Sequence, residues 1–138
     1  MKKAFTLIEM LVVVAIIGIL ATAVIISIGP ARTQARDSRI RGDVEQLRNL
    51  AEVYFNQNNF SYAGFSCNTT IGGTSAQTLC SDVNTQNGGQ GQPSITATQN
   101  SLCIVARLAS GGYICMDTTG KVANSATAIT CTTNGTCP

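Results

Sequence analysis

One carboxylate stands at the head of a long apolar stretch, and it has the clearest chemical task in this chain. Glu9 follows Phe5-Thr-Leu-Ile, and residues 10–28 (MLVVVAIIGILATAVIISI) carry no charge. Such a run is long enough to cross a bilayer as a helix. A carboxylate at the mouth of an apolar helix is costly to desolvate and calls for a positive partner. We expect this partner to be an amine.

The first four residues indicate a source for such an amine. They read Met1-Lys2-Lys3-Ala4, two cations followed by a small residue. A cut after Ala4 would leave Phe5 as a new N-terminus with a positive charge. In a parallel stack of helices this amine would meet Glu9 of a neighbouring copy in apolar surroundings. Attraction is strong there, but desolvation cancels much of the gain, so the pair is expected to set register more than stability.

A second interpretation of Glu9 needs no neighbour. An acidic side chain at the start of a helix complements the positive end of the helix dipole. Thr6 stands three residues earlier and is able to satisfy backbone donors at the same end. The two interpretations of Glu9 are compatible.

Six cysteines are the other residues with evident chemistry, and all follow the apolar run. They are Cys67, Cys80, Cys103, Cys115, Cys131 and Cys137. An even number in a small polar domain indicates disulfides formed in an oxidising compartment. No two have C-x-x-C spacing and the chain has no histidine, so we expect no zinc or other metal site. Six cysteines allow 15 pairings, of which we favour the sequential one: 67 with 80, 103 with 115, and 131 with 137.

The composition argues against an enzyme. The commonest general base, histidine, is missing. The chain also has no G-x-S-x-G sequence, no phosphate-binding loop and no pair of carboxylates in an apolar setting. We therefore expect no catalytic residue and no cofactor.

The length of 138 residues leaves room for one domain at most. Beyond the leader and the helices the globular part has roughly 80 residues, which is small for a self-sufficient core, so disulfide staples are expected. The net charge is only +2, which gives no general attraction to nucleic acid.

After Gly29-Pro30, where a kink or local melting is expected, residues 31–58 become amphipathic. The apolar positions recur every three or four residues: Ile40, Val44, Leu47, Ala51 and Tyr54 or Phe55. Charged side chains take the other faces, and Arg41 with Glu45 and Arg48 with Glu52 have the spacing of helical ion pairs. This helix is expected to pack its apolar stripe against the globular domain.

The rest of the chain predicts a small antiparallel sheet. Residues 59–100 are expected to form a long surface loop with one short helical turn at 76–83. Strands are expected at 101–107, 112–117, 121–123 and 126–132, with turns at Ser110-Gly-Gly and Asp117-Thr-Thr-Gly. Three or four of them would lie across the second half of the helix.

The N-terminal 55 or so residues resemble those of type IV pilins and type II secretion pseudopilins. The match is the short basic leader followed by FTLIEMLVVVAIIGILA, with Phe5 first and Glu9 fifth after the cut. The resemblance implies cleavage between Ala4 and Phe5 by a prepilin peptidase on the cytoplasmic side, N-methylation of Phe5, and assembly through Phe5 and Glu9. The family usually has glycine before the cut, so with Ala4 we expect slower or equal processing.

The resemblance also implies an α+β, pilin-like fold with four parts: leader 1–4, transmembrane or filament-core helix 5–29, amphipathic helix 30–58 and disulfide-stapled domain 59–138. The function implied is that of a structural subunit in a helical homo-oligomeric filament. It would sit in inner-membrane lipid with its N-terminus in the cytoplasm, and then enter an extracellular pilus or a periplasmic pseudopilus. Its partners would be the peptidase, an assembly platform and an ATPase.

Three features leave alternatives. The arginines at 32, 36, 39 and 41 favour a cytoplasmic far flank by the positive-inside rule, but the cysteines favour the opposite side. These arginines carry the charge needed to bind DNA phosphates, but we expect a solvated flank or salt bridges between neighbouring subunits. Some pseudopilins bind calcium in the loop corresponding to Asp117, but one carboxylate is too few and a turn role is expected.

The alternative function is a membrane-anchored or secreted disulfide-rich binding domain, with Ala21-Thr-Ala23 imitating a signal-peptidase site.

Overall fold

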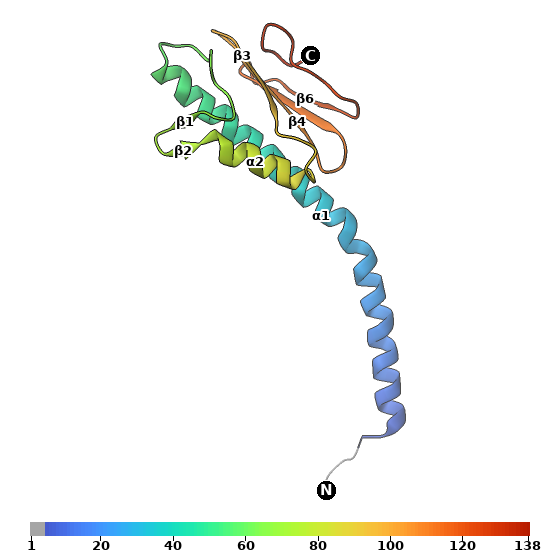
Figure 1. The fold of residues 1–138 in the computed structure, drawn as a ribbon. Helices are drawn as coiled ribbons and strands as arrows, with labels where there is room; N and C mark the ends of the chain where they lie inside the picture. Colours follow the sequence, from blue (N-terminus) through green and yellow to red (C-terminus); the bar gives the residue numbers. More distant parts are fainter. Residues whose placement is uncertain (1–4) are drawn as a thin grey trace. The chain divides into compact units, whose positions relative to one another are not determined.

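The computed structural model describes residues 5–138 (Figure 1). The leader, with the basic residues and the Ala4 side of the predicted cut, lies outside the described residues. The chain divides into two compact units between Thr33 and Gln34. The second unit, Gln34–Pro138, holds the entire sheet and all six cysteines.

A single helix of 51 residues, α1, spans Leu7–Gln57. It ends one residue before the predicted boundary. Pro30 lies inside it and Gly29 is helical too, so the local melting expected at this point is not found. Proline removes one amide donor from the helical ladder. The Thr33 hydroxyl donates to the Gly29 carbonyl oxygen at 3.4 Å.

The sheet has four strands, and all neighbours are antiparallel. They are β3 (Ser94–Ala97), β4 (Leu102–Arg107), β5 (Tyr113–Asp117) and β6 (Val122–Ser125), in that spatial order. The predicted strands near 101–107, 112–117 and 121–123 are therefore confirmed as β4, β5 and β6. The α+β architecture of one long helix with a small antiparallel sheet is confirmed as well.

Two predictions for the globular part are wrong. Residues 59–100 are not one long loop, because they contain a hairpin of β1 (Thr70–Ile71) and β2 (Thr74–Ser75), the helix α2 (Ala76–Gln86) and strand β3. Gly72 and Gly73 have φ of 54° and 83° in the hairpin turn, a conformation that suits glycine. The strand expected at 126–132 does not form, since β6 ends at Ser125 and the following residues are irregular.

The predicted stripe of α1 forms the centre of the core. Ile40, Val44, Leu47 and Ala51 are completely buried. They pack in one cluster with side chains of α2 and of the sheet, among them Val83 and Ile104. Figure 1 shows α2 and the sheet beside this half of α1. Full burial of each large apolar side chain contributes about 1.5–3 kcal/mol, so this stripe fixes the sheet and α2 on the helix.

The other face of the sheet is covered by the C-terminal tail. Val105, Cys103 and Cys115 form a second buried cluster with Cys137, and Ile129 packs against it. Strand β4 is therefore buried on both faces, which explains its unbroken apolar sequence LCIVA. A tail that covers one face of a sheet has to be held in place, and the cysteines do this.

Surface charges pair differently from the helical pattern expected. Within residues 5–138 the salt bridge present is Arg39–Asp82, with Nε 2.6 Å from Oδ2, which joins α1 to α2. Arg41 donates to the Asn124 side-chain oxygen at 2.7 Å instead of pairing with Glu45. The predicted pairs Arg41–Glu45 and Arg48–Glu52 are not formed in this part of the chain.

Candidate functional site

The start of α1 brings Thr6 and Glu9 together. The Thr6 backbone N–H donates to Glu9 Oε2 at 3.0 Å, and the Thr6 hydroxyl donates to the same oxygen at 2.9 Å. In return the Glu9 N–H donates to the Thr6 hydroxyl oxygen at 3.3 Å. This reciprocal arrangement is a capping box, which satisfies amide donors that have no partner inside the helix.

The capping box assigns one carboxylate oxygen of Glu9 to the helix start and leaves the other for a neighbouring copy. Its Thr-x-x-Glu signature is visible in the sequence, which predicts both residues at the helix start but not their reciprocal hydrogen bonds. Within the described residues only Oε2 of Glu9 receives a hydrogen bond, so Oε1 remains able to accept another donor. Phe5 precedes the helix and is 76% exposed. Both residues of the amine–acid pair expected between copies are therefore exposed.

The apolar part of α1 has no cover within its own chain. All described side chains from Phe5 to Val24 are exposed, including Leu7 at 79% and Ile19 at 71%. By length and composition, α1 is the one helix of residues 5–138 able to cross a membrane. A soluble monomer rarely exposes more than a few hundred Å² of contiguous apolar surface. A surface of this kind is normally covered by lipid or by another apolar surface.

The surface of this segment also has a shallow groove and a glycine with open space beside it. Ile17, Leu20, Ala21 and Val24 line a shallow, entirely apolar groove of about 450 Å³. A Cβ at Gly18 would meet no atom within 4 Å, so nothing in this chain requires a glycine there. Glycine inside a helix is unfavourable compared with alanine. Small residues at such positions let a second helix approach closely.

Three disulfides staple the globular unit, and two of the three predicted pairs are wrong. Cys67 is bonded to Cys80 as predicted. Cys103 is bonded to Cys131, and Cys115 to Cys137. The error came from the hairpin register, because a turn centred on Ala109 would place Cys103 opposite Cys115.

The observed hairpin is centred one residue later than predicted. It pairs Arg107 with Tyr113, and therefore Cys103 with Asp117 and Cys115 with Val105. A shift of one residue in the centre moves each partner by two positions. The cysteines of both strands face the tail and bond to it.

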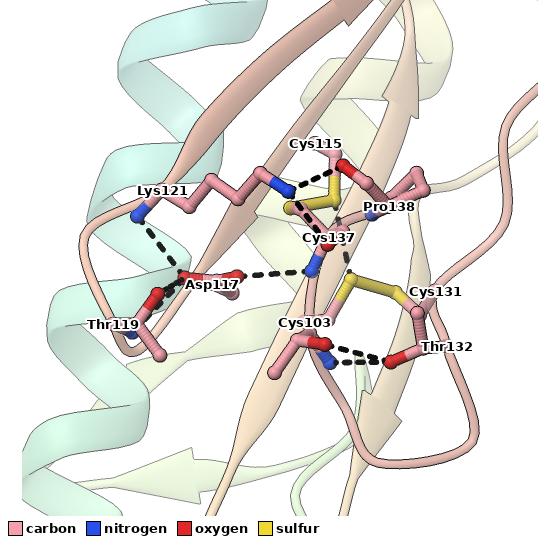
Figure 2. The surroundings of a disulfide bond; sticks show 10 residues. Cys103, Cys115, Asp117, Thr119, Lys121, Cys131, Thr132, Cys137 and Pro138 are labelled. Atoms are coloured by element: carbon pink, nitrogen blue, oxygen red, sulfur yellow. Dashed lines mark hydrogen bonds between the residues drawn. A yellow bond between two sulfur atoms is a disulfide. The ribbon is translucent and has the colours of Figure 1, made fainter.

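The buried carboxylate of Asp117 connects the turn after β5 to the C-terminal tail, beside the two disulfides (Figure 2). Its Oδ1 accepts the Thr119 hydroxyl at 2.6 Å and the N–H groups of Thr119 and Lys121, and its Oδ2 accepts the Cys137 N–H at 2.9 Å. Burial pushes the pKa of this carboxyl up, but the hydrogen bonds outweigh burial and hold the pKa below its usual value. Asp117 therefore ties the turn after β5 to the tail.

The comparisons with known proteins concern the N-terminal segment. Residues 1–25 match the family model described as the prokaryotic N-terminal methylation motif, the signature of type IV pilins and pseudopilins. No curated protein and no solved structure matches the chain. The motif confirms the resemblance found in the sequence, and the long helix, small antiparallel sheet and three disulfides fit a pilin-like fold.

Proposed function

We propose that this protein is a structural subunit, a pilin or pseudopilin, of a helical filament assembled through its N-terminal helix. The uncovered apolar surface of α1 is the observation that supports this most strongly. Surface of this kind is stable in lipid, and on leaving lipid it must be buried again at once. Neighbouring copies of the same helix supply a matching surface. Packing of this type that does not close into a ring produces a helix.

The proposed route starts with cleavage between Ala4 and Phe5 by a prepilin peptidase and methylation of the new amine. The motif at residues 1–25 supports this step. Before assembly the subunit crosses the inner membrane once, with its N-terminus in the cytoplasm. The disulfides support an oxidising location for the globular unit. An assembly platform and an ATPase then move it into an extracellular pilus or a periplasmic pseudopilus.

In the filament, the Phe5 amine of one copy pairs with Glu9 of the next. The capping box supports this pairing, because it fixes Glu9 at the helix start while Oε1 accepts no hydrogen bond from residues 5–138. A buried ion pair gives little net stability, but its two charges are costly to leave unpaired. The pair therefore selects one axial register among the many that a smooth apolar helix permits.

Two substitutions separate the charge from the cap. Glu9→Gln keeps a side-chain oxygen for the Thr6 donors and loses the charge, whereas Thr6→Ala weakens the cap and keeps the charge. We expect cells with Glu9→Gln to insert and cleave the protein but to form few filaments by electron microscopy. Thr6→Ala filaments should form, with only the cost of a lost cap, about 1 kcal/mol. Normal assembly of Glu9→Gln would remove the charge from the mechanism.

Mass spectrometry of the mature N-terminus tests the proposal as a whole. Methylated Phe5 as the first residue is the expected result. An intact Met1, or a start near Ala23, would instead identify a membrane-anchored or secreted disulfide-rich binding domain.

A further inference from the structure

A groove between α1 and α2 carries an unbalanced negative charge. Its volume is about 510 Å³, and its wall includes Arg39, Asp43, Gln46, Thr78, Asp82 and Thr85. Every polar side chain in this set except Arg39 offers an oxygen atom. The groove lies inside the globular unit, on the side of α1 that α2 covers.

Asp43 is the unusual member of this wall. It is only 7% exposed, and its Oδ2 atom is buried with no hydrogen-bond donor. The helical pattern of the sequence puts charged residues, Asp43 included, on faces other than the apolar stripe. A buried carboxylate without a donor is expensive, and proteins normally supply a donor or a cation to it. Here the described residues supply no hydrogen-bond donor to Oδ2.

The neighbouring charges do not compensate Asp43. The carboxyl of Asp82 lies close enough to interact with that of Asp43, and Asp82 itself holds the Arg39 guanidinium, whose Nε is 2.6 Å from Oδ2. Gln86 donates to the other oxygen of Asp82 at 3.2 Å. When both acids are ionised, this group has two negative charges and one positive charge. One more cation would balance it.

We propose that this groove binds a divalent metal cation, with the carboxylates of Asp43 and Asp82 as its charged ligands. Carboxylate, amide and hydroxyl oxygens are the ligands that calcium prefers, and the groove offers all three types. Arg39 remains on Asp82 and lowers the affinity, so the dissociation constant falls in the range of extracellular calcium modules, about 10⁻⁴–10⁻³ M. Because Asp43 belongs to α1 and Asp82 to α2, the bound cation would stabilise the packing of α2 on α1.

This site is separate from the turn at Asp117. The oxygens of Asp117 already accept four hydrogen bonds from Thr119, Lys121 and Cys137. A cation there would have to displace donors that the fold provides. In the groove, the buried Oδ2 atom of Asp43 accepts no hydrogen bond from residues 5–138, and the oxygens of Asp82 accept one each, from Arg39 and Gln86.

The test is calcium titration of the full-length protein in detergent micelles, by calorimetry and by thermal unfolding. We expect one calcium ion per chain, and a thermal midpoint that rises by several degrees in millimolar calcium chloride. Measurements belong at pH 7.5, because burial, then the hydrogen bond to Asp82 and the charge of Asp82, raise the pKa of Asp43 to about 6. Magnesium at equal concentration should give a smaller shift, since it dehydrates reluctantly.

Three variants decide the location of the site. Asp43→Asn and Asp82→Asn should each weaken calcium binding about tenfold or more. Glu45→Gln removes one exposed acid from the same helix and should leave binding unchanged. Asp43→Asn loses an unpartnered buried charge, so without calcium it should be at least as stable as the parent protein. No calcium-induced shift in the parent, or an equal shift in Asp43→Asn and Glu45→Gln, would overturn the proposal.

Discussion

The Sγ atoms of Cys103 and Cys115 lie 3.2 Å apart, although each is bonded to a different cysteine of the tail. Both residues are completely buried. The two strands place them on the same face of the sheet, on diagonal positions of the β4–β5 hairpin. The sulfur atoms of Cys103, Cys115 and Cys131 all lie within 4.8 Å of one another. The two disulfides therefore form one sulfur cluster under the tail (Figure 2).

Loss of one tail cysteine should consequently change the pairing of the others. In Cys137→Ser the thiol of Cys115 is left beside the Cys103–Cys131 bond. Its thiolate is placed to attack Cys103 Sγ, which forms a 103–115 disulfide and releases Cys131 as a thiolate. Peptide mapping by mass spectrometry after alkylation should find 103–115 disulfide together with labelled Cys131.

The first disulfide provides the matched control for this exchange. Cys67→Ser leaves a thiol on Cys80, which is bonded only to Cys67 in the parent and does not belong to the sulfur cluster. Its label should appear on Cys80 alone, with both other disulfides intact. If Cys137→Ser carries its label only on Cys115, the contact between the two disulfides does not permit exchange.

Truncation of Leu47 should test the packing of the sheet on α1. This side chain is completely buried in the main core, whereas Val53 on the same helix is 45% exposed. Leu47→Ala removes buried methyl groups and leaves a cavity, at a cost of about 2–5 kcal/mol, and Val53→Ala should cost less than about 0.5 kcal/mol. Urea unfolding of the full-length chain in detergent measures both. Equal effects would mean that the helix is not packed as described.

The same stripe shows what the sequence could predict and what it could not. Ile40 to Ala51 follow the helical period, so their burial was readable without any knowledge of the partner surface. The disulfide pairing was not, because an error of one residue in a turn moves Cys103 from Cys115 to Asp117. Strand β3 is short and lies at the sheet edge, after the glycine-rich residues 88–91, so it gives almost no periodic signal.

Asp43 was misread for a related reason. Its position on α1 is polar by type, and burial there depends on α2, which the sequence indicated only as a short turn. Asp43 is buried because α2, which is distant in the sequence, covers it. The spacing of residues along α1 does not indicate where α2 will pack. The capping box at Thr6 and Glu9 is the opposite case, since both partners lie within one helical turn.

Acid should loosen the tail through Asp117. The pKa of this carboxyl is held below the ordinary value by hydrogen bonds that outweigh its burial. The ionised form is thus favoured by folding: its contribution to the free energy of unfolding is present above about pH 4 and is lost as pH falls through the lower pKa of the folded protein. Unfolding free energies should therefore decrease in the parent protein at acid pH. Asp117→Asn should have a lower free energy of unfolding at pH 7, and this free energy should depend less on pH below pH 4. Parallel pH curves for the two proteins would contradict this role of Asp117.

Alkali should act through Tyr62. The hydroxyl of this residue donates to both carboxylate oxygens of Glu52, each at 2.9 Å, and its ring stacks on Phe55 with 4.4 Å between centroids. Burial, the hydrogen bond to Glu52 and the charge of Glu52 together raise the pKa of Tyr62 to about 12. The neutral phenol is therefore favoured by folding, so its contribution to stability is present below about pH 10 and is lost between pH 10 and about 12.

Tyrosinate absorbance measures this ionisation directly. The parent protein should show a late phase near pH 12 that Tyr62→Phe removes. Glu52→Gln keeps an oxygen acceptor and removes the charge, so the late phase should move to lower pH without disappearing. An unchanged profile in Glu52→Gln would mean that burial and the hydrogen bond raise the pKa of Tyr62 without help from the charge of Glu52. The loop after α1 would then be held to the helix by the Phe55–Tyr62 stack, with no electrostatic share from Glu52.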